Sequence, residues 1–167
     1  SYTGPVPELY KRFIDDGFAA TTLSEQQLTA FIQFIQDFHP AINYTYAISC
    51  TTVTFLDIQV NVKDGAFSTS VFYKPTDSHS YLDYSSSHST ATKNSIPYSQ
   101  FLRLRRLCSD TDDFCQKSIE MSSFFTNRGY PTVVVQEALS RVKNLDRHQL
   151  LAPKTVPPSD RPIVSLL

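Results

Sequence analysis

The sequence predicts an α+β fold, in which an antiparallel sheet with one packed helix is followed by a helical half. Asp-Gly pairs at residues 16–17 and 64–65 are typical of tight turns between antiparallel strands. After Pro97, the spacing of apolar residues changes from a period of two to that of a helix. With 167 residues, 41% of them hydrophobic, the chain is long enough to bury a core.

A hairpin is expected at the start of the chain. Residues 8–14 and 18–22 are rich in apolar and β-branched side chains, and each has the length of a short strand. Asp15-Asp16-Gly17 lies between them, and glycine after aspartate favours a tight turn because it adopts a positive φ without a steric clash. We therefore expect both aspartates to be exposed at the tip of a hairpin.

A helix is expected next. Ser24 and Gln27 have the spacing of a capping box, which marks a helix N-terminus. Pro40 cannot continue a helix, so the helix ends soon after residue 38. Apolar residues at helical spacing give it one apolar face: Leu28, Phe31, Ile32, Ile35 and Phe38.

Three further strands complete the expected sheet. Residues 44–50 and 53–62 are rich in β-branched and aromatic residues, and the second range alternates between apolar and polar positions. Asp64-Gly65 predicts a second hairpin turn, after which residues 66–73 return antiparallel. These elements define a first region, residues 1–75.

The rest of the chain divides into three regions. Half of the residues in 76–95 are serine or threonine, which predicts a long loop or linker. Residues 96–150 are expected to form three helices, and residues 151–167, rich in proline, an irregular tail.

Turn and cap residues place the three helices. Pro97 suits a first helical turn, and the aspartates at 110–113 offer N-caps for a second helix that runs to about Thr126. Gly129 and Pro131 predict a stop and a restart, so that a third helix covers about 132–144. The expected core anchors of the second helix are Phe114, Ile119 and Phe125.

Charge is distributed unevenly along the chain. Residues 1–92 carry four lysines and arginines against nine acidic residues, a net charge of −5. Residues 93–167 carry eleven against seven, a net charge of +4. The basic part is therefore the part expected to face phosphate. Three cysteines argue against a disulfide framework and favour an intracellular location, with the nucleus as a candidate compartment. No apolar run approaches the roughly 18 residues that span a bilayer, so no membrane partner is expected.

Asp15 and Asp16 are the candidate metal ligands. Two adjacent carboxylates at a hairpin tip suit a hard divalent cation such as Mg²⁺, although aspartate is also common in ordinary polar turns. Nucleotidyl transfer needs a further carboxylate from another strand. Asp57 is the nearest candidate along the chain, and the spacing alone does not assign it.

Arginines supply the candidate contacts to nucleic acid. Arg103, Arg105 and Arg106 lie in the first helix of the back half, and Arg128 precedes the third. Such residues contact phosphates independently of base sequence, or else form a solvated helix face with intrahelical ion pairs. The three helices have the order of a helix-turn-helix arrangement, with a plain helical bundle as the alternative. The residues after Pro131 open the last helix with β-branched side chains, which argues against base reading by that helix.

Six short motifs occur in an order and with gaps that resemble Penelope-like reverse transcriptases. The resemblance covers nearly all of residues 8–150. The motifs are RFIDD (12–16), FLD (55–57), YKPTD (73–77), SIPY (95–98), LRLRRLCS (102–109) and RGYP (128–131). Related animal sequences carry a helix-turn-helix domain over the back half.

The resemblance implies the C-terminal part of an RNA-directed DNA polymerase. Residues 1–75 would be part of the palm, with Asp15 and Asp16 as the catalytic turn that holds Mg²⁺. Lys74 would lie near the primer grip and contact nucleic acid. Residues 96–150 would be the thumb, which holds the RNA template and the DNA primer.

The same resemblance places essential parts of the enzyme upstream of residue 1. The fingers and the palm strand with the first catalytic aspartate precede this region in the family, so the chain is expected to be inactive by itself. Two other functions stay open at this point. The chain could be a non-catalytic helix-turn-helix module that binds nucleic acid, or a degenerate remnant of a retroelement.

Overall fold

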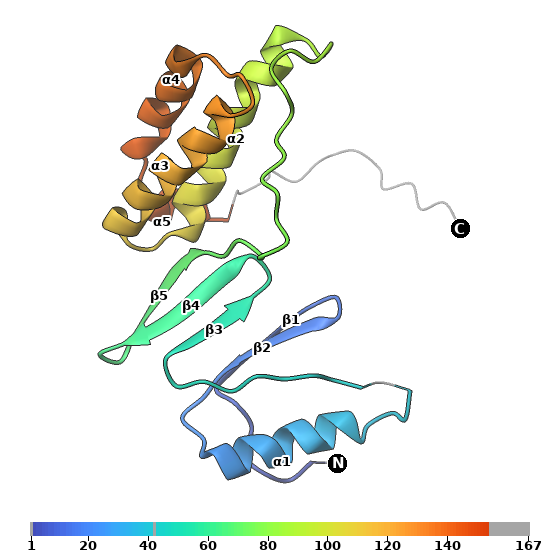
Figure 1. Cartoon of the computed structure of the whole chain (residues 1–167). Coiled ribbons are helices and arrows are strands. Elements are labelled where there is room, and N and C mark those ends of the chain that lie inside the picture. The colour runs from blue at the N-terminus through green and yellow to red at the C-terminus, as the bar shows by residue number, and fades with distance from the viewer. Residues whose placement is uncertain (1, 42, 154–167) are drawn as a thin grey trace, which may run out of the picture. The chain divides into compact units, whose positions relative to one another are not determined.

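The computed structural model describes residues 2–41 and 43–153, which are coloured in Figure 1. The chain divides into two compact units, residues 1–78, here called the sheet unit, and residues 79–167, the helical unit. The described part of the sheet unit holds five strands and one helix, and that of the helical unit holds four helices. The predicted α+β class is confirmed. Most of the expected tail at 151–167 lies outside the described residues.

The first hairpin is present, but its turn is one residue earlier than predicted. β1 (Leu9–Phe13) pairs antiparallel with β2 (Asp16–Ala20). The turn consists of Ile14 and Asp15, and Ile14 adopts a φ of 54°. A positive φ is uncommon for a β-branched residue, so this turn is backbone-strained. Gly17, expected in the turn, therefore lies in β2.

Gly17 lies close to a ring that packs against α1. A Cβ at this position would come within 3.3 Å of the hydroxyl of Tyr10, so the Tyr10 ring would have to shift slightly to accept a larger residue. The Tyr10 ring in turn contacts Phe31 of α1 (Glu25–Gln36), with 6.3 Å between ring centroids. The predicted capping box at Ser24 is confirmed, because both of its hydrogen bonds are formed.

The second sheet has three antiparallel strands in the order β3-β4-β5. They are β3 (Thr52–Phe55), β4 (Ile58–Lys63) and β5 (Ala66–Val71). The single strand predicted over 53–62 is wrong, because a two-residue turn with Leu56 at a φ of 56° divides it. The apolar positions 55 and 58 are three apart rather than two, and this break in alternation marks the turn.

The turn between β4 and β5 is the predicted Asp64-Gly65 turn. Its two residues have φ values of 51° and 73°, the pattern of a type I′ hairpin turn. The paired registers place the apolar side chains of all three strands on one face of the sheet. Phe18 of β2 packs near Phe55 on this face, with 5.5 Å between ring centroids.

Residues 44–50, predicted as a strand, form none in the structure. The segment has the composition of a strand, but no other strand in the described residues pairs with it. A strand is defined by its ladder of hydrogen bonds to a neighbour, and composition alone does not supply one.

The helical unit begins its first helix earlier than predicted. α2 (Thr90–Leu107) is capped by the hydroxyl of Ser89, and Pro97 lies inside the helix, fully buried. The start expected near residue 96 is therefore wrong. Ser89 caps an N–H group in the first turn of the helix, and Pro97, which the sequence predicts in that first turn, lies well inside the helix instead of at its start. Residues 90–95 of the expected linker thus belong to the helix.

The remaining helices follow the prediction more closely. α3 (Thr111–Thr126) and α4 (Thr132–Lys143) have the expected bounds within one or two residues, and Asp110 caps α3. A fourth helix, α5 (Arg147–Leu151), was not predicted. Its five residues are too few to show a helical pattern.

The helical unit has a well-packed core. α3 contributes its buried residues at spacings of four, three and four, so Ile119 falls off the buried face and is 67% exposed. The prediction that Ile119 is a core anchor is therefore wrong. Buried apolar residues come from α2, α3, α4 and their connections: Phe101, Leu104, Cys108, Phe114, Met121, Phe125, Tyr130, Val135, Ala138 and Val142.

The segment before α2 is ordered by contacts within the helical unit. His79 stacks on Phe124 with 3.9 Å between ring centroids. The backbone N–H of Tyr84 donates to the carbonyl of Arg128, at 2.9 Å. Lys93 donates to the carbonyl of Tyr84 at 2.8 Å, so α2 also holds this segment in place.

Candidate nucleic-acid interface

A tight connection joins α3 to α4 (Figure 1). Gly129 adopts a φ of 76°, which lets the chain reverse after α3. The N–H of Tyr130 then donates to the carbonyl of Phe125, at 3.2 Å, and Pro131 begins α4. The N-cap Pro131 makes no side-chain hydrogen bond, so the first amides of α4 are not capped in that way. This is a helix–turn–helix connection whose second helix begins with two exposed residues, Thr132 and Val133.

Tyr130 anchors this turn in the core. The centroid of its ring lies 5.1 Å from the centroid of the Phe125 ring and 5.1 Å from that of the Tyr84 ring. Its hydroxyl is buried and has no hydrogen-bond partner among the described residues. Burial also raises the pKa of Tyr130, because the phenolate would be charged in an apolar site.

Replacing Tyr130 with phenylalanine is expected to leave the stability of the helical unit unchanged or to raise it by about 1 kcal/mol, because it removes an unsatisfied buried hydroxyl. Tyr84→Phe is the matched control, since the Tyr84 hydroxyl donates to Asn94 Oδ1 at 3.1 Å and its removal should lower stability slightly. Urea unfolding followed by circular dichroism measures both. A marked loss of stability in Tyr130→Phe would show that the hydroxyl has a partner.

The exposed face of α4 is more polar than its sequence suggests. Of the three consecutive valines, Val135 is buried, Val134 is half-buried and Val133 is 59% exposed. The sequence argument that apolar β-branched side chains make α4 unsuited to base reading therefore applies fully only to Val133. The other exposed side chains of α4 are mostly polar or charged: Thr132, Gln136, Glu137, Ser140, Arg141 and Lys143.

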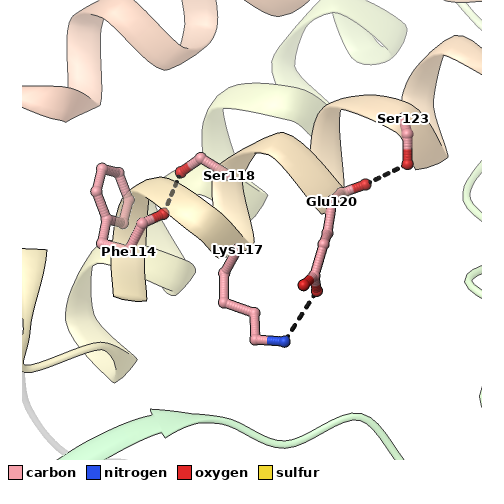
Figure 2. Close-up of polar contacts among 5 residues, drawn as sticks. All are labelled: Phe114, Lys117, Ser118, Glu120 and Ser123. Atoms are coloured by element: carbon pink, nitrogen blue, oxygen red, sulfur yellow. Dashed lines mark hydrogen bonds and ion pairs between the residues drawn. The ribbon is translucent and has the colours of Figure 1, made fainter. Parts of the chain in front are cut away.

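α3 has few groups to offer a ligand (Figure 2). The Ser118 hydroxyl donates to the Phe114 carbonyl at 2.7 Å, and the Ser123 hydroxyl to the Glu120 carbonyl at 2.6 Å. Lys117 and Glu120 form an ion pair at 2.9 Å. These hydroxyls and this lysine are thus engaged within α3 itself.

Part of the arginine cluster predicted on α2, which consists of Arg103, Arg105 and Arg106, has a structural role. Nε of Arg105 donates to the carbonyl of Leu145 at 3.1 Å, and its guanidinium lies 5.3 Å from the centre of the Phe114 ring. In return, Nε of Arg147 donates to the carbonyl of Arg106 at 3.0 Å. These reciprocal bonds satisfy one carbonyl in the last turn of α2 and one in the connection between α4 and α5, and they hold α5 against α2.

The other two arginines of the cluster are half-buried. Arg103 and Arg106 lie in the last turns of α2. Nε of Arg106 is buried without a hydrogen-bond partner in the described part of the chain. Arg106 therefore retains a donor that its own fold does not satisfy.

Two further cations lie on α4, which packs along α2. Arg141 of α4 is exposed, and its guanidinium sits 4.2 Å from the centre of the Tyr98 ring of α2. Lys143, at the end of α4, is also exposed. The sequence showed both only as added charge in the back half, since their closeness to α2 depends on how α4 packs. We call Arg103, Arg105, Arg106, Arg141, Lys143 and Arg147 the basic end of the helical unit.

Arg128 and Lys74, also predicted to bind nucleic acid, lie elsewhere. Arg128 is half-buried in the α3–α4 turn. The pKa of Asp83 is lowered, mainly by hydrogen bonds from Ser85 and further by the charge of Arg128, so Asp83 offsets part of that charge. Lys74 is exposed just after β5, in the sheet unit. Arg128 is therefore not part of the basic end, and Lys74 belongs to the other unit.

The predicted metal ligands are exposed at the first hairpin. Asp15 lies in the turn and Asp16 at the start of β2, as the sequence predicted for the hairpin tip. No group of three histidine, cysteine, aspartate or glutamate side chains in the described residues is arranged to hold a metal ion. Asp57 is thus not brought into such a group. The donor set of the described chain does not fit a two-ion catalytic site by itself.

Comparison with known families bears on the helical unit. Residues 80–140 match the family model of the animal helix-turn-helix domain. No curated protein and no solved structure matches the chain. The helix-turn-helix match covers α2, α3 and most of α4, which agrees with the connection described above. It covers none of the sheet unit, so the reverse transcriptase assignment stays a prediction. No helix in the described residues is long and apolar enough to cross a membrane.

Proposed function

We propose that the helical unit is a nucleic-acid-binding helix-turn-helix module. The match of residues 80–140 to the animal helix-turn-helix domain supports this function above all. Charge adds to it: residues 79–153 carry nine lysines and arginines against seven acidic residues, a net charge of +2. Residues 1–78 carry four against eight, a net charge of −4. The helical unit is therefore the part of the chain that attracts phosphate.

The basic end is the proposed binding surface. Arg141 and Lys143 are exposed there and offer charged donors to phosphate oxygens. Nε of Arg106 is buried, so a phosphate contact from this half-buried residue would use its terminal guanidinium nitrogens. Arg103 adjoins them on α2, and Arg128 adds a separate contact at the α3–α4 turn. Arg105 supports the surface through its bond to Leu145 rather than by binding phosphate itself. This arrangement favours contacts to the sugar–phosphate backbone of the nucleic acid, which do not depend on base sequence.

The rival mode is sequence-specific reading by α4. Its exposed face offers Thr132, Gln136 and Ser140, which are side chains able to bond to base edges. Glu137 lies on the same exposed side of the helix and would be repelled by nearby phosphates. We favour binding to the sugar–phosphate backbone because two exposed cations, Arg141 and Lys143, lie at the end of α4, whereas the side chains suited to base reading share their face with the negative charge of Glu137.

A binding titration tests this function and separates the two modes. The full chain is titrated with labelled duplexes of unrelated sequence at several salt concentrations. Backbone binding gives similar affinities and a steep loss of affinity with salt. A preference of about a hundredfold for one duplex that persists at high salt would favour base reading instead. Absence of binding at low salt to any duplex or single strand would contradict the proposed function.

A second candidate function is that of a reverse transcriptase fragment. The strained turn at Ile14 supports it, because it presents Asp15 at the exposed tip of a hairpin and strained residues cluster at functional sites. In this proposal the sheet unit is part of the palm, and the helical unit is the thumb that holds RNA template and DNA primer. Further carboxylates from an upstream region would be needed to complete the magnesium site, since the described residues lack a suitable group.

The isolated chain is expected to show no polymerase activity. Two-metal nucleotidyl transfer requires carboxylates that hold both ions, and the described residues do not bring such a group together. Primer extension by purified residues 1–167 with magnesium measures this, with a complete reverse transcriptase as the positive control. Extension that disappears in Asp15→Asn would prove the expectation wrong.

A further inference from the structure

Residues 43–50 have the properties of a strand that lacks a neighbour. The segment contains no charged residue, no proline and no glycine, and it is rich in aromatic and β-branched side chains. Residues 45–50 are all exposed, including Tyr46 at 54% and Ile48 at 40%. Within the described chain, no backbone group of residues 45–49 forms a hydrogen bond. Exposed backbone of this composition is a ready template for strand pairing.

One edge of this segment is bonded to α1 at Tyr44. In an extended strand, the backbone groups of residues 44, 46 and 48 point to one edge, and those of 45, 47 and 49 to the other. Nε2 of Gln36, in α1, donates to the carbonyl of Tyr44 at 2.7 Å, so the first edge faces α1. The open edge therefore belongs to Thr45, Ala47 and Ser49.

We propose that this open edge pairs with the same edge of a second copy of the chain. Antiparallel pairing centred on Ala47 places Thr45 opposite Ser49 of the other copy, and Tyr46 opposite Ile48. Hydroxyl pairs and pairs of an aromatic with a β-branched residue are among the favourable cross-strand neighbours. The segment is thus complementary to itself, and because it is uncharged, no like charges come to lie opposite each other.

This geometry closes at two copies. A two-fold axis through Ala47 uses the same edge on both chains, so the pairing of this edge is complete with two copies. The net charge of −4 on residues 1–78 opposes the approach of two sheet units. Salt screens this repulsion over about 8 Å at physiological ionic strength, so dimer formation should strengthen as salt rises.

Sedimentation of the full chain over a wide concentration range tests the proposal. We expect a monomer–dimer equilibrium, together with amide hydrogen exchange that slows at Thr45, Ala47 and Ser49 as concentration rises. A monomer at every concentration would overturn the proposal. A dimer whose protected amides lie outside residues 44–50 would overturn it as well, and so would protection that does not depend on concentration.

A pair of variants at one position makes the test specific. Ala47→Pro removes the central N–H donor of each copy and is expected to weaken the dimer about ten- to hundredfold, since two hydrogen bonds can no longer form. Ala47→Val keeps the donor and should preserve the dimer. Phe38→Lys controls for general apolar adhesion, because Phe38 is 80% exposed outside the segment.

The outcome of these variants decides the proposal in either direction. A dimer that survives Ala47→Pro, or one that Phe38→Lys abolishes, would overturn it. If Ala47→Pro does not fold, Tyr46→Lys replaces it, since a charge within an exposed strand edge blocks pairing without removing a backbone donor. This test is independent of nucleic acid, so its failure leaves the proposed function unaffected.

Discussion

Replacing Phe125 with alanine is expected to destabilise the helical unit by about 3–5 kcal/mol. The Phe125 side chain is fully buried. The centroid of its ring lies 4.7 Å from that of Tyr81, 6.1 Å from that of Phe101 and 5.1 Å from that of Tyr130. Alanine would leave a cavity where α2, α3 and the α3–α4 turn meet. Because domains are stable by only about 5–15 kcal/mol, this loss brings the helical unit close to unfolding.

Urea unfolding followed by circular dichroism at the helical wavelength measures this effect, since the helical unit supplies four of the five described helices. Phe38→Ala is the matched control, because the same side chain is removed from a position that is 80% exposed. It should change stability very little. Equal effects of the two substitutions would contradict the packing described for the helical unit.

Replacing Arg141 and Lys143 together with alanine is expected to lower the salt dependence of nucleic-acid binding by about two units, one for each phosphate that is no longer neutralised. Affinity at low salt should fall by a similar factor for every duplex sequence, because binding to phosphate carries no base information. Both side chains are exposed at the end of α4, and the Arg141 guanidinium also rests on the Tyr98 ring. Circular dichroism checks that the double variant remains folded.

Lys117→Ala is the matched control for this experiment. Lys117 also carries one positive charge, but it pairs with Glu120 on α3 and is not one of the residues of the basic end. Its removal should leave the salt dependence unchanged. If Lys117→Ala reduced binding as much as the double variant, binding would follow net charge alone, and the basic end would not be the binding surface. A loss limited to one duplex sequence would instead favour base reading by α4.

Local signals predicted much of the fold. Ser24 with Gln27 and Asp110 mark true helix starts, and Asp64-Gly65 forms the expected turn. These signals succeed because a cap or a tight turn involves residues only two or three positions apart. The early start of α2 was missed for a related reason: the proline at residue 97 is tolerated inside a helix that Ser89 has already begun.

Predictions that depend on distant neighbours were less accurate. Residues 44–50 have the composition of a strand, but a strand also needs a partner, and none is present among the described residues. The first hairpin turns at Ile14 and Asp15 because the register pairs Phe13 with Asp16, which the Asp-Gly signal does not specify. Ile119 has an apolar side chain, yet the packing face of α3 excludes it.

The candidate site shows the same division. Charge and helical spacing in the sequence were enough to predict a basic, helical back half with a turn at residues 127–131, and this agrees with the helix-turn-helix match. How each cation is used depends on the packing of the helices. Arg105 bonds to a carbonyl forty residues away, whereas Arg141 and Lys143 stay exposed beside α2. A charge pattern shows where cations lie along the chain, but their burial and partners depend on how the helices pack, because those interactions join residues far apart in sequence.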